Sequence, residues 1–271
     1  MGGVIGIAAG AAAAWTLLVL VLFLLQRQIL FVPDTTRPEP GLDGPPTMTR
    51  VHATTIDGLS LEGWWYPPPD VGLTIVYFHG NAGHVGTREA KAQRLIARGY
   101  GVLLAGYRGY GGNPGRPSET GLIRDGHGWL TAVESLGVER DAVLLYGESL
   151  GSGVVAALAQ EHSVAGVVLE APYTSIADIA ASQYWYVPVR RLLLDRFDTL
   201  SRIPGVRAPV LIVHGTEDRV IPVEHGARVY AAASEPKRFA RLEGGGHSNL
   251  FDHGALEALD DFVNELVRPA P

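Results

Sequence analysis

The sequence contains no cysteine, and charged residues make up only 18% of its 271 residues. The lack of cysteine excludes disulfides, thiolate metal sites and a cysteine nucleophile, but it leaves the compartment open. The net charge of −6 argues against a nucleic-acid partner, because such a partner needs a basic face. The sequence also lacks H-E-x-x-H and comparable ligand spacings, so neither a metal nor a cofactor is expected.

The first stretch of the chain lacks charge altogether. Val4–Leu25 holds 22 residues whose only polar side chain is Thr16, which is long enough to cross a bilayer. A cleaved signal peptide is the alternative, but no Lys or Arg precedes the apolar run and no small-x-small site follows it. We therefore expect an uncleaved transmembrane anchor over residues 1–27. The nearest basic residues on its C-terminal side favour, slightly, a cytoplasmic catalytic domain: Arg27, Arg37 and Arg50.

Small residues recur every four positions in this anchor, at Gly2, Gly6 and Gly10. Such a stripe lets two membrane helices pack closely, which would give a homodimer. Glycine and alanine are also common in membrane helices without any such role. The Pro- and Gly-rich residues 28–48 that follow are predicted to be a linker.

Residues 49–271 carry the pattern of one α/β domain. The chain as a whole is 46% apolar and long enough to bury a sizeable core. Asp57-Gly58 joins two alternating strands, Thr49–Ile56 and Leu59–Trp65, in a hairpin. Short apolar strands then alternate with helices, which predicts a mostly parallel sheet covered on both faces. Residues 174–207 interrupt this alternation and are predicted to form a cap. The expected strands are Leu73–Phe78, Gly101–Ala105, Ala142–Tyr146, Val164–Leu169, Pro209–Val213 and Lys237–Leu242, and the expected helices Thr87–Arg98, Glu119–Leu136, Leu150–Glu161, Val223–Ala233 and Ala255–Val267.

A serine lies in the middle of Gly147-Glu148-Ser149-Leu150-Gly151, between a predicted strand and a predicted helix. Gly-x-Ser-x-Gly in this setting is the spacing of a nucleophile elbow, in which the glycines let the chain turn sharply. The N-terminus of the following helix then points at a developing oxyanion. Glycine and serine also fill ordinary turns, so the assignment needs a base, an acid and an oxyanion donor elsewhere in the chain.

The expected base is His247, which follows three glycines directly after the last predicted strand; His253 is the second choice. The expected acid is Asp218, in the loop after the preceding strand, and Glu170 is its rival. The order Ser149, Asp218, His247 is the order of triads on this type of sheet.

Two backbone N–H groups are expected to stabilise the oxyanion, those of Leu150 and of Asn81 in the loop after Val76–His79. The adjacent aromatic residues Tyr184, Trp185 and Tyr186 cannot all face inward on a helix. We expect this group to line an acyl pocket or to touch lipid.

These motifs together resemble the α/β-hydrolase fold, and within it the branch of single-pass, membrane-anchored serine hydrolases that are serine aminopeptidase- or lysophospholipase-like. The resemblance runs from about Arg50 to Val267, and Ser152 and Asn113 depart from the pattern without touching the triad. It implies an eight-stranded sheet, a Ser-Asp-His triad and hydrolysis of carboxylic esters or thioesters. The motifs that carry it are His79–Gly83, Tyr107–Gly111, Pro117–Glu119, Gly147–Gly151, His214–Asp218 and Gly246-His247.

The sequence therefore predicts a membrane-anchored serine hydrolase acting on small-molecule or lipid acyl esters, without a cofactor. The alternatives within this class are an acyl-protein thioesterase, a lysophospholipase or monoacylglycerol lipase, and a serine peptidase. A catalytically inactive α/β-hydrolase that serves as a binding scaffold is the alternative of a different class. Acyl-chain length and leaving group stay open at this point.

Overall fold

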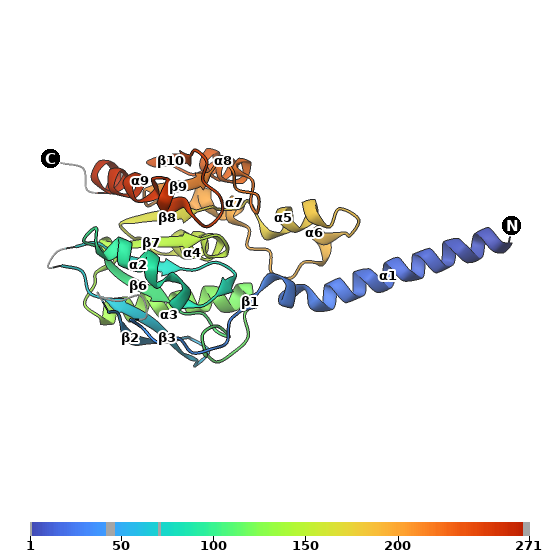
Figure 1. The fold of residues 1–271 in the computed structure, drawn as a ribbon, viewed down its shortest axis with the longest axis horizontal. Coiled ribbons are helices and arrows are strands. Elements are labelled where there is room, and N and C mark those ends of the chain that lie inside the picture. The colour runs from blue at the N-terminus through green and yellow to red at the C-terminus, as the bar shows by residue number, and fades with distance from the viewer. Residues whose placement is uncertain (1, 42–46, 70–71, 268–271) are drawn as a thin grey trace.

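The short apolar runs of the sequence become the strands of one sheet in the computed structural model, which describes residues 2–41, 47–69 and 72–267. Its eight strands lie in the order β10-β9-β8-β7-β4-β6-β3-β2 (Figure 1). All neighbours are parallel except the pairs β2–β3 and β3–β6, which confirms the mostly parallel eight-stranded sheet. The bounds are β2 Thr49–Thr54, β3 Ser60–Tyr66, β4 Thr74–Phe78, β6 Gly101–Ala105, β7 Val143–Glu148, β8 Gly166–Glu170, β9 Val210–Gly215 and β10 Lys237–Leu242.

Helices cover both faces of the sheet, so the central strands are apolar on both sides. In β4, Ile75 and Tyr77 pack into one core, whereas Val76 and Phe78 pack into the other. The first core is covered by α2 and α9, and the second by α3, α4 and α8. These helices span Glu89–Ile96 (α2), Glu119–Ser135 (α3), Leu150–Glu161 (α4), Val223–Ala232 (α8) and Ala255–Phe262 (α9).

The segment between β8 and β9, where the sequence predicts a cap over residues 174–207, folds into short helices. Ser175 caps α5 by accepting a hydrogen bond from Asp178 N, and Asp198 caps α7 by accepting one from Ser201 N. The cap comprises α5 Ile176–Gln183, α6 Val189–Leu192, α7 Thr199–Arg202 and η3 Ile203–Gly205. Short helical turns elsewhere are η1 Val85–Arg88, η2 Arg140–Ala142, η4 Leu250–His253 and η5 Val263–Val267.

The apolar N-terminal stretch is one helix, α1, Gly2–Leu30, which projects away from the rest of the molecule (Figure 1). By length and composition its Gly3–Leu30 part could cross a membrane, which would suit an anchor or a signal sequence. A Cβ added at Gly6 or Gly10 would have no described neighbour within 4 Å, and the predicted dimer through Gly2, Gly6 and Gly10 stays a prediction.

The predicted linker, residues 28–48, has structure of its own. Its first three residues continue α1, because Ile29 and Leu30 extend the apolar pattern of the helix. A short strand follows, β1 Val32–Pro33, which pairs in parallel with β5 Ala82–Gly83. Residues 42–46 of the predicted linker lie outside the described residues. The chain after α1 is therefore attached to the loop that follows β4.

Helix α4 lies so close to β4 that one position admits no side chain. A Cβ at Gly151 would lie 2.1 Å from Phe78 O, whereas a Cβ at Gly80 would have its nearest neighbours at 3.5 Å. We expect Gly151→Ala to lower the free energy of unfolding by about 1–3 kcal/mol, since the helix has to shift. Gly80→Ala is the matched control. Thermal unfolding of the full chain checks this, and equal stability of the two variants would contradict it.

Candidate active site

Ser149 stands at the sharp turn between β7 and α4, with φ 50° and ψ −115°. This conformation is strained for a residue with a side chain, and such strain is typical of functional sites. The turn is tight, since a Cβ at Gly147 would lie 2.6 Å from Gly151 O. Ser149 N donates a hydrogen bond of 2.8 Å to Glu170 O on the neighbouring strand. The local sequence therefore builds the sharp strand-to-helix turn expected of Gly-x-Ser-x-Gly.

The structure brings the three predicted triad residues together from three separate loops. His247 Nε2 lies 3.1 Å from Ser149 Oγ, and His247 Nδ1 lies 2.7 Å from Asp218 Oδ2. Asp218 Oδ1 accepts hydrogen bonds of 2.8 Å from the main-chain N–H groups of Val220 and Ile221. The carboxylate is thus fixed on the side of the imidazole that faces away from the serine, which is the arrangement that activates a serine hydroxyl.

Burial raises the pKa of Asp218, but hydrogen bonds to its carboxylate outweigh burial and hold the pKa well below its usual range. Two of the side chains responsible are His247 and His214. His214 is fully buried, and its Nε2 lies 3.4 Å from Asp218 Oδ2 and 2.8 Å from Ile221 O. Asp218 is consequently an anion at neutral pH. Our sequence reasoning did not give His214 this supporting position, although its place at the end of β9 was a usable signal.

The two rival residues lie in other environments. The carboxylate of Glu170 is fully buried and contacts Lys91 and Tyr146 instead of His247. His253 Nδ1 lies 3.1 Å from Glu243 O, and its Nε2 lies 3.2 Å from the Asn249 side-chain nitrogen. The geometry therefore favours Asp218 over Glu170 and His247 over His253.

The two predicted oxyanion donors, Asn81 and Leu150, border the same cavity as Ser149. Leu150 is the first residue of α4, so its N–H has no acceptor within the helix. Asn81 is held by the end of α1 and the chain after it: its main-chain oxygen accepts a hydrogen bond from Val32 N, and its side chain donates one to Leu30 O.

A cavity of about 440 Å³ opens onto Ser149 and His247. Its wall is mostly apolar and includes Tyr184 of the predicted aromatic group. Trp185 and Tyr186 do not line it, and the Trp185 side chain is 82% exposed. Three consecutive residues at the end of α5 point in different directions, so only one of them reaches the cavity.

Residues 70–200 match the family described as serine aminopeptidase, S33. An uncharacterized protein of Mycobacterium tuberculosis is 37% identical over 250 residues, which cover 89% of this chain and 88% of that protein. Alpha/beta hydrolase domain-containing protein 17B of Homo sapiens is 32% identical over 203 residues, which cover 73% of this chain and 69% of that protein. The chain belongs to the α/β-hydrolase family.

Solved structures agree with this fold. An esterase of Pyrococcus furiosus superposes on the α/β-hydrolase described above with a TM-score of 0.70 at 17% identity, over 88% of this chain and 98% of the esterase. At this identity the likeness concerns the fold alone. By family, the protein is a hydrolase.

Among the described residues, one group of this hydrolase has ligand atoms close enough for a metal ion: His127, Glu161 and His162. Both ring nitrogens of His162 are already engaged, one with the Arg140 guanidinium and the other with His127 Nδ1 at 2.8 Å. The positive charge of Arg140 also opposes a cation there. We interpret the group as a hydrogen-bonded surface cluster.

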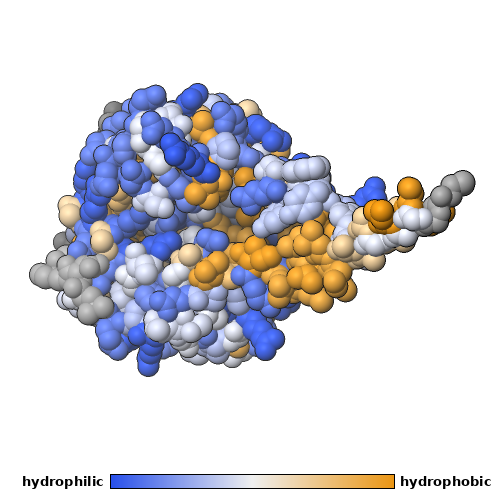
Figure 2. Space-filling view, turned by 45° about the vertical axis from the view of Figure 1, so that its right-hand side comes forward, coloured by the Kyte–Doolittle hydropathy of each residue, from blue (hydrophilic) through white to orange (hydrophobic). Residues whose placement is uncertain are grey.

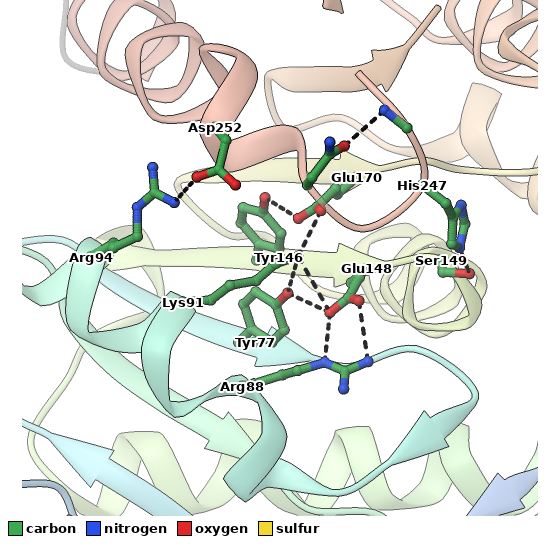
Figure 3. A network of polar contacts seen from close by, with 12 residues as sticks. Tyr77, Arg88, Lys91, Arg94, Tyr146, Glu148, Ser149, Glu170, His247 and Asp252 are labelled. Atoms are coloured by element: carbon green, nitrogen blue, oxygen red, sulfur yellow. Dashed lines mark hydrogen bonds and ion pairs between the residues drawn. The ribbon is translucent and has the colours of Figure 1, made fainter. Parts of the chain in front are cut away.

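A buried ionic network lies next to Ser149 of this α/β-hydrolase (Figure 3). The Glu148 carboxylate accepts hydrogen bonds from Tyr77 Oη at 2.6 Å and from Arg88 Nε at 2.9 Å. Glu170, on the next strand, contacts Lys91 Nζ at 2.7 Å, and Lys91 also lies 3.8 Å from Glu148. Burial raises the pKa of Glu148, but Lys91 and Arg88 hold it well below its usual range. The local sequence pattern does not indicate this network, because Glu148 and Glu170 lie on different strands.

We expect Lys91→Met to lower the free energy of unfolding by about 3–5 kcal/mol at pH 7, because it leaves the buried Glu170 carboxylate without its cation and takes from Glu148 one of its two. The depressed pKa of Glu148 contributes stability above its unfolded value of about 4.3, so the deficit should shrink as the pH falls below that value. Arg94→Met, on the same helix but in an exposed pair with Asp252, is the control and should cost about 0–1 kcal/mol. Denaturant unfolding between pH 3 and pH 8 measures both, and a pH-independent deficit would contradict the network's role.

Proposed function

We propose that this α/β-hydrolase is a membrane-anchored serine hydrolase that cleaves the esters of acyl chains. The observation that carries the proposal is a pair of hydrogen bonds, one between Ser149 Oγ and His247 Nε2 and the other between His247 Nδ1 and Asp218 Oδ2. A serine needs such a base to be a nucleophile at neutral pH, and the base needs an anion to orient it.

In the proposed reaction His247 Nε2 takes the proton of Ser149 Oγ as the oxygen attacks the ester carbonyl carbon. The N–H groups of Asn81 and Leu150 stabilise the resulting oxyanion, at about 3 kcal/mol per donor in related chemistry. The C–O bond to the alcohol then breaks, and the alcohol leaves with the proton from His247. Water, deprotonated by His247, attacks the acyl-enzyme, and the carboxylic acid is released as Ser149 recovers its proton.

The cavity supports an acyl chain in preference to a peptide. Its described lining is largely aliphatic and aromatic, and none of the lining residues carries a carboxylate that would pair with the ammonium group of a peptide N-terminus. An apolar chain gains by leaving water in such a site. Ser149 and His247 are polar groups of the same wall, so an acyl chain in the cavity would lie next to the reacting centre.

Contacts between α1 and the cap support an anchor that is retained. Trp15 Nε1 donates to Tyr186 O at 2.9 Å, and Arg27 Nε donates to Asp195 Oδ2 at 2.7 Å. Asp195 is buried, and removal of α1 as a signal peptide would leave it without this cation. An anchor keeps the site near a membrane, where acyl esters of lipids are abundant. A catalytic domain on the cytoplasmic side stays the prediction from the basic residues after the helix.

We expect Ser149→Ala to lower ester hydrolysis by on the order of 10⁴- to 10⁶-fold, since the nucleophile is lost. The measurement is hydrolysis of p-nitrophenyl esters from acetyl to palmitoyl by the full chain in detergent, with fluorophosphonate labelling in parallel. Hydrolysis that survives in the variant would contradict the serine mechanism. Labelling without ester turnover would favour a thioester substrate, and neither labelling nor turnover would favour a binding scaffold.

Asp218→Asn should lower kcat by about 10⁴-fold, because the amide no longer holds the imidazole in the required tautomer or stabilises its cation. Glu170→Gln is the matched control and should retain most of kcat. Steady-state kinetics on the preferred ester compares the two. The reverse pattern would transfer the acid's role to Glu170.

A further inference from the structure

One face of α1 is packed against the rest of the molecule in the last three turns of the helix. Val19, Leu22, Phe23, Gln26 and Leu30 are half-buried, and their spacing is that of a single helix face. Residues on the opposite face are exposed. The buried face is therefore the surface by which the helix joins the rest of the fold.

Polar contacts fix this face in position beside the cap. The Arg27 guanidinium reaches Asp195 with Nε at 2.7 Å and a second nitrogen at 3.3 Å, and Asp195 also accepts a hydrogen bond from Glu119 N. The Gln26 side-chain oxygen accepts a hydrogen bond of 2.8 Å from Leu194 N. These bonds hold the helix in one rotational setting, so the same side chains face the cap.

The packed face forms one wall of the 440 Å³ cavity. The opposite wall is the cap, through residues such as Ile179 and Leu192, and the cavity reaches Ser149 and His247. Its lining from α1 is Val19, Leu22, Phe23, Gln26, Ile29 and Leu30. The apolar surface of α1 continues onto the globular part where the helix meets it (Figure 2). The wall is thus largely apolar from the helix to Ser149, with Gln26 as a polar member on α1.

The length of α1 places this cavity at the edge of a bilayer. At a rise of 1.5 Å per residue, the 28 residues of Gly3–Leu30 extend for about 42 Å, whereas the hydrocarbon core is about 30 Å thick. About eight residues at the C-terminal end, from Phe23 on, therefore emerge beside the globular part. The exposed Leu194 of the cap lies beside this end, since its N–H is bonded to Gln26. The cap also reaches farther along the helix, because Trp15 is bonded to Tyr186 O, and the exposed Trp185 next to Tyr186 therefore lies beside the part of α1 that would be in the bilayer.

We propose that this face of α1 and the cap together bind the acyl chain of a membrane lipid ester, which passes from the bilayer along α1 to Ser149. The proposal rests on the proposed hydrolase function and names its substrate class and its specificity residues. The anchor is then part of the binding site, and the side chain at position 23 limits how long a chain fits.

Phe23→Trp adds bulk inside the cavity, whereas Leu24→Trp adds bulk on the opposite face, where Leu24 is 64% exposed. In the full chain in lipid nanodiscs, we expect Phe23→Trp to lower kcat/KM for the palmitoyl ester by about 10- to 100-fold and to leave the acetyl ester unchanged. Leu24→Trp should change neither. Phe23→Ala should shift the optimum to longer chains.

Labelling rates with short- and long-chain alkyl fluorophosphonates give a second readout that does not depend on turnover. A short-chain labelling rate equal to that of the wild type shows that Phe23→Trp is folded. If Phe23→Trp does not fold, Phe23→Ala alone tests the proposal. An unchanged chain-length profile in both variants, with Ser149-dependent hydrolysis intact, would overturn the acyl site on α1 and leave the proposed function standing. Absence of hydrolysis and labelling in the wild type would instead overturn the function.

Discussion

The positive φ of Ser149 is the constraint on which the rest of the site depends. A residue with a side chain pays about 1–3 kcal/mol for such a conformation, so the surrounding structure has to enforce it. Gly147 and Gly151 permit the close approach of β7 and α4, and the hydrogen bond from Ser149 N to Glu170 O ties the turn to β8. With the turn held in this way, the hydroxyl projects toward His247, and the first N–H groups of α4 point into the same space.

The buried ionic network next to this turn also helps to hold Ser149 in position. Glu148 and Glu170 come from adjacent strands, and the cations that satisfy them, Arg88 and Lys91, come from the segment that covers β4 (Figure 3). Charged groups in a low-dielectric interior tolerate few arrangements, because an unpaired one is costly. The network therefore fixes the relative position of three central strands and α2 immediately behind the nucleophile, while the walls of the cavity in front remain apolar.

The sequence predicts the elements that short-range sequence signals determine. The alternation of strands and helices, the Asp57-Gly58 hairpin and the turn around Ser149 each have short-range signals, and the glycines before His247 mark the last loop. The pairing of Lys91 with Glu170 could not be predicted, because Glu170 lies 79 residues away on β8 and a lysine on a helix is usually solvated. The cavity wall on α1 was missed for a related reason, since an apolar helix shows no preferred face in its sequence when all of its faces are apolar.

Asn81 connects α1 to the cavity that holds Ser149. Its two polar groups are both held by the chain around the end of α1, and β1 adds a strand pairing to the same loop. The N-terminal helix is consequently not an exchangeable tether. Replacing it by another apolar helix of equal length would remove a wall of the cavity that opens onto Ser149, and a fragment without α1 would have a different binding site.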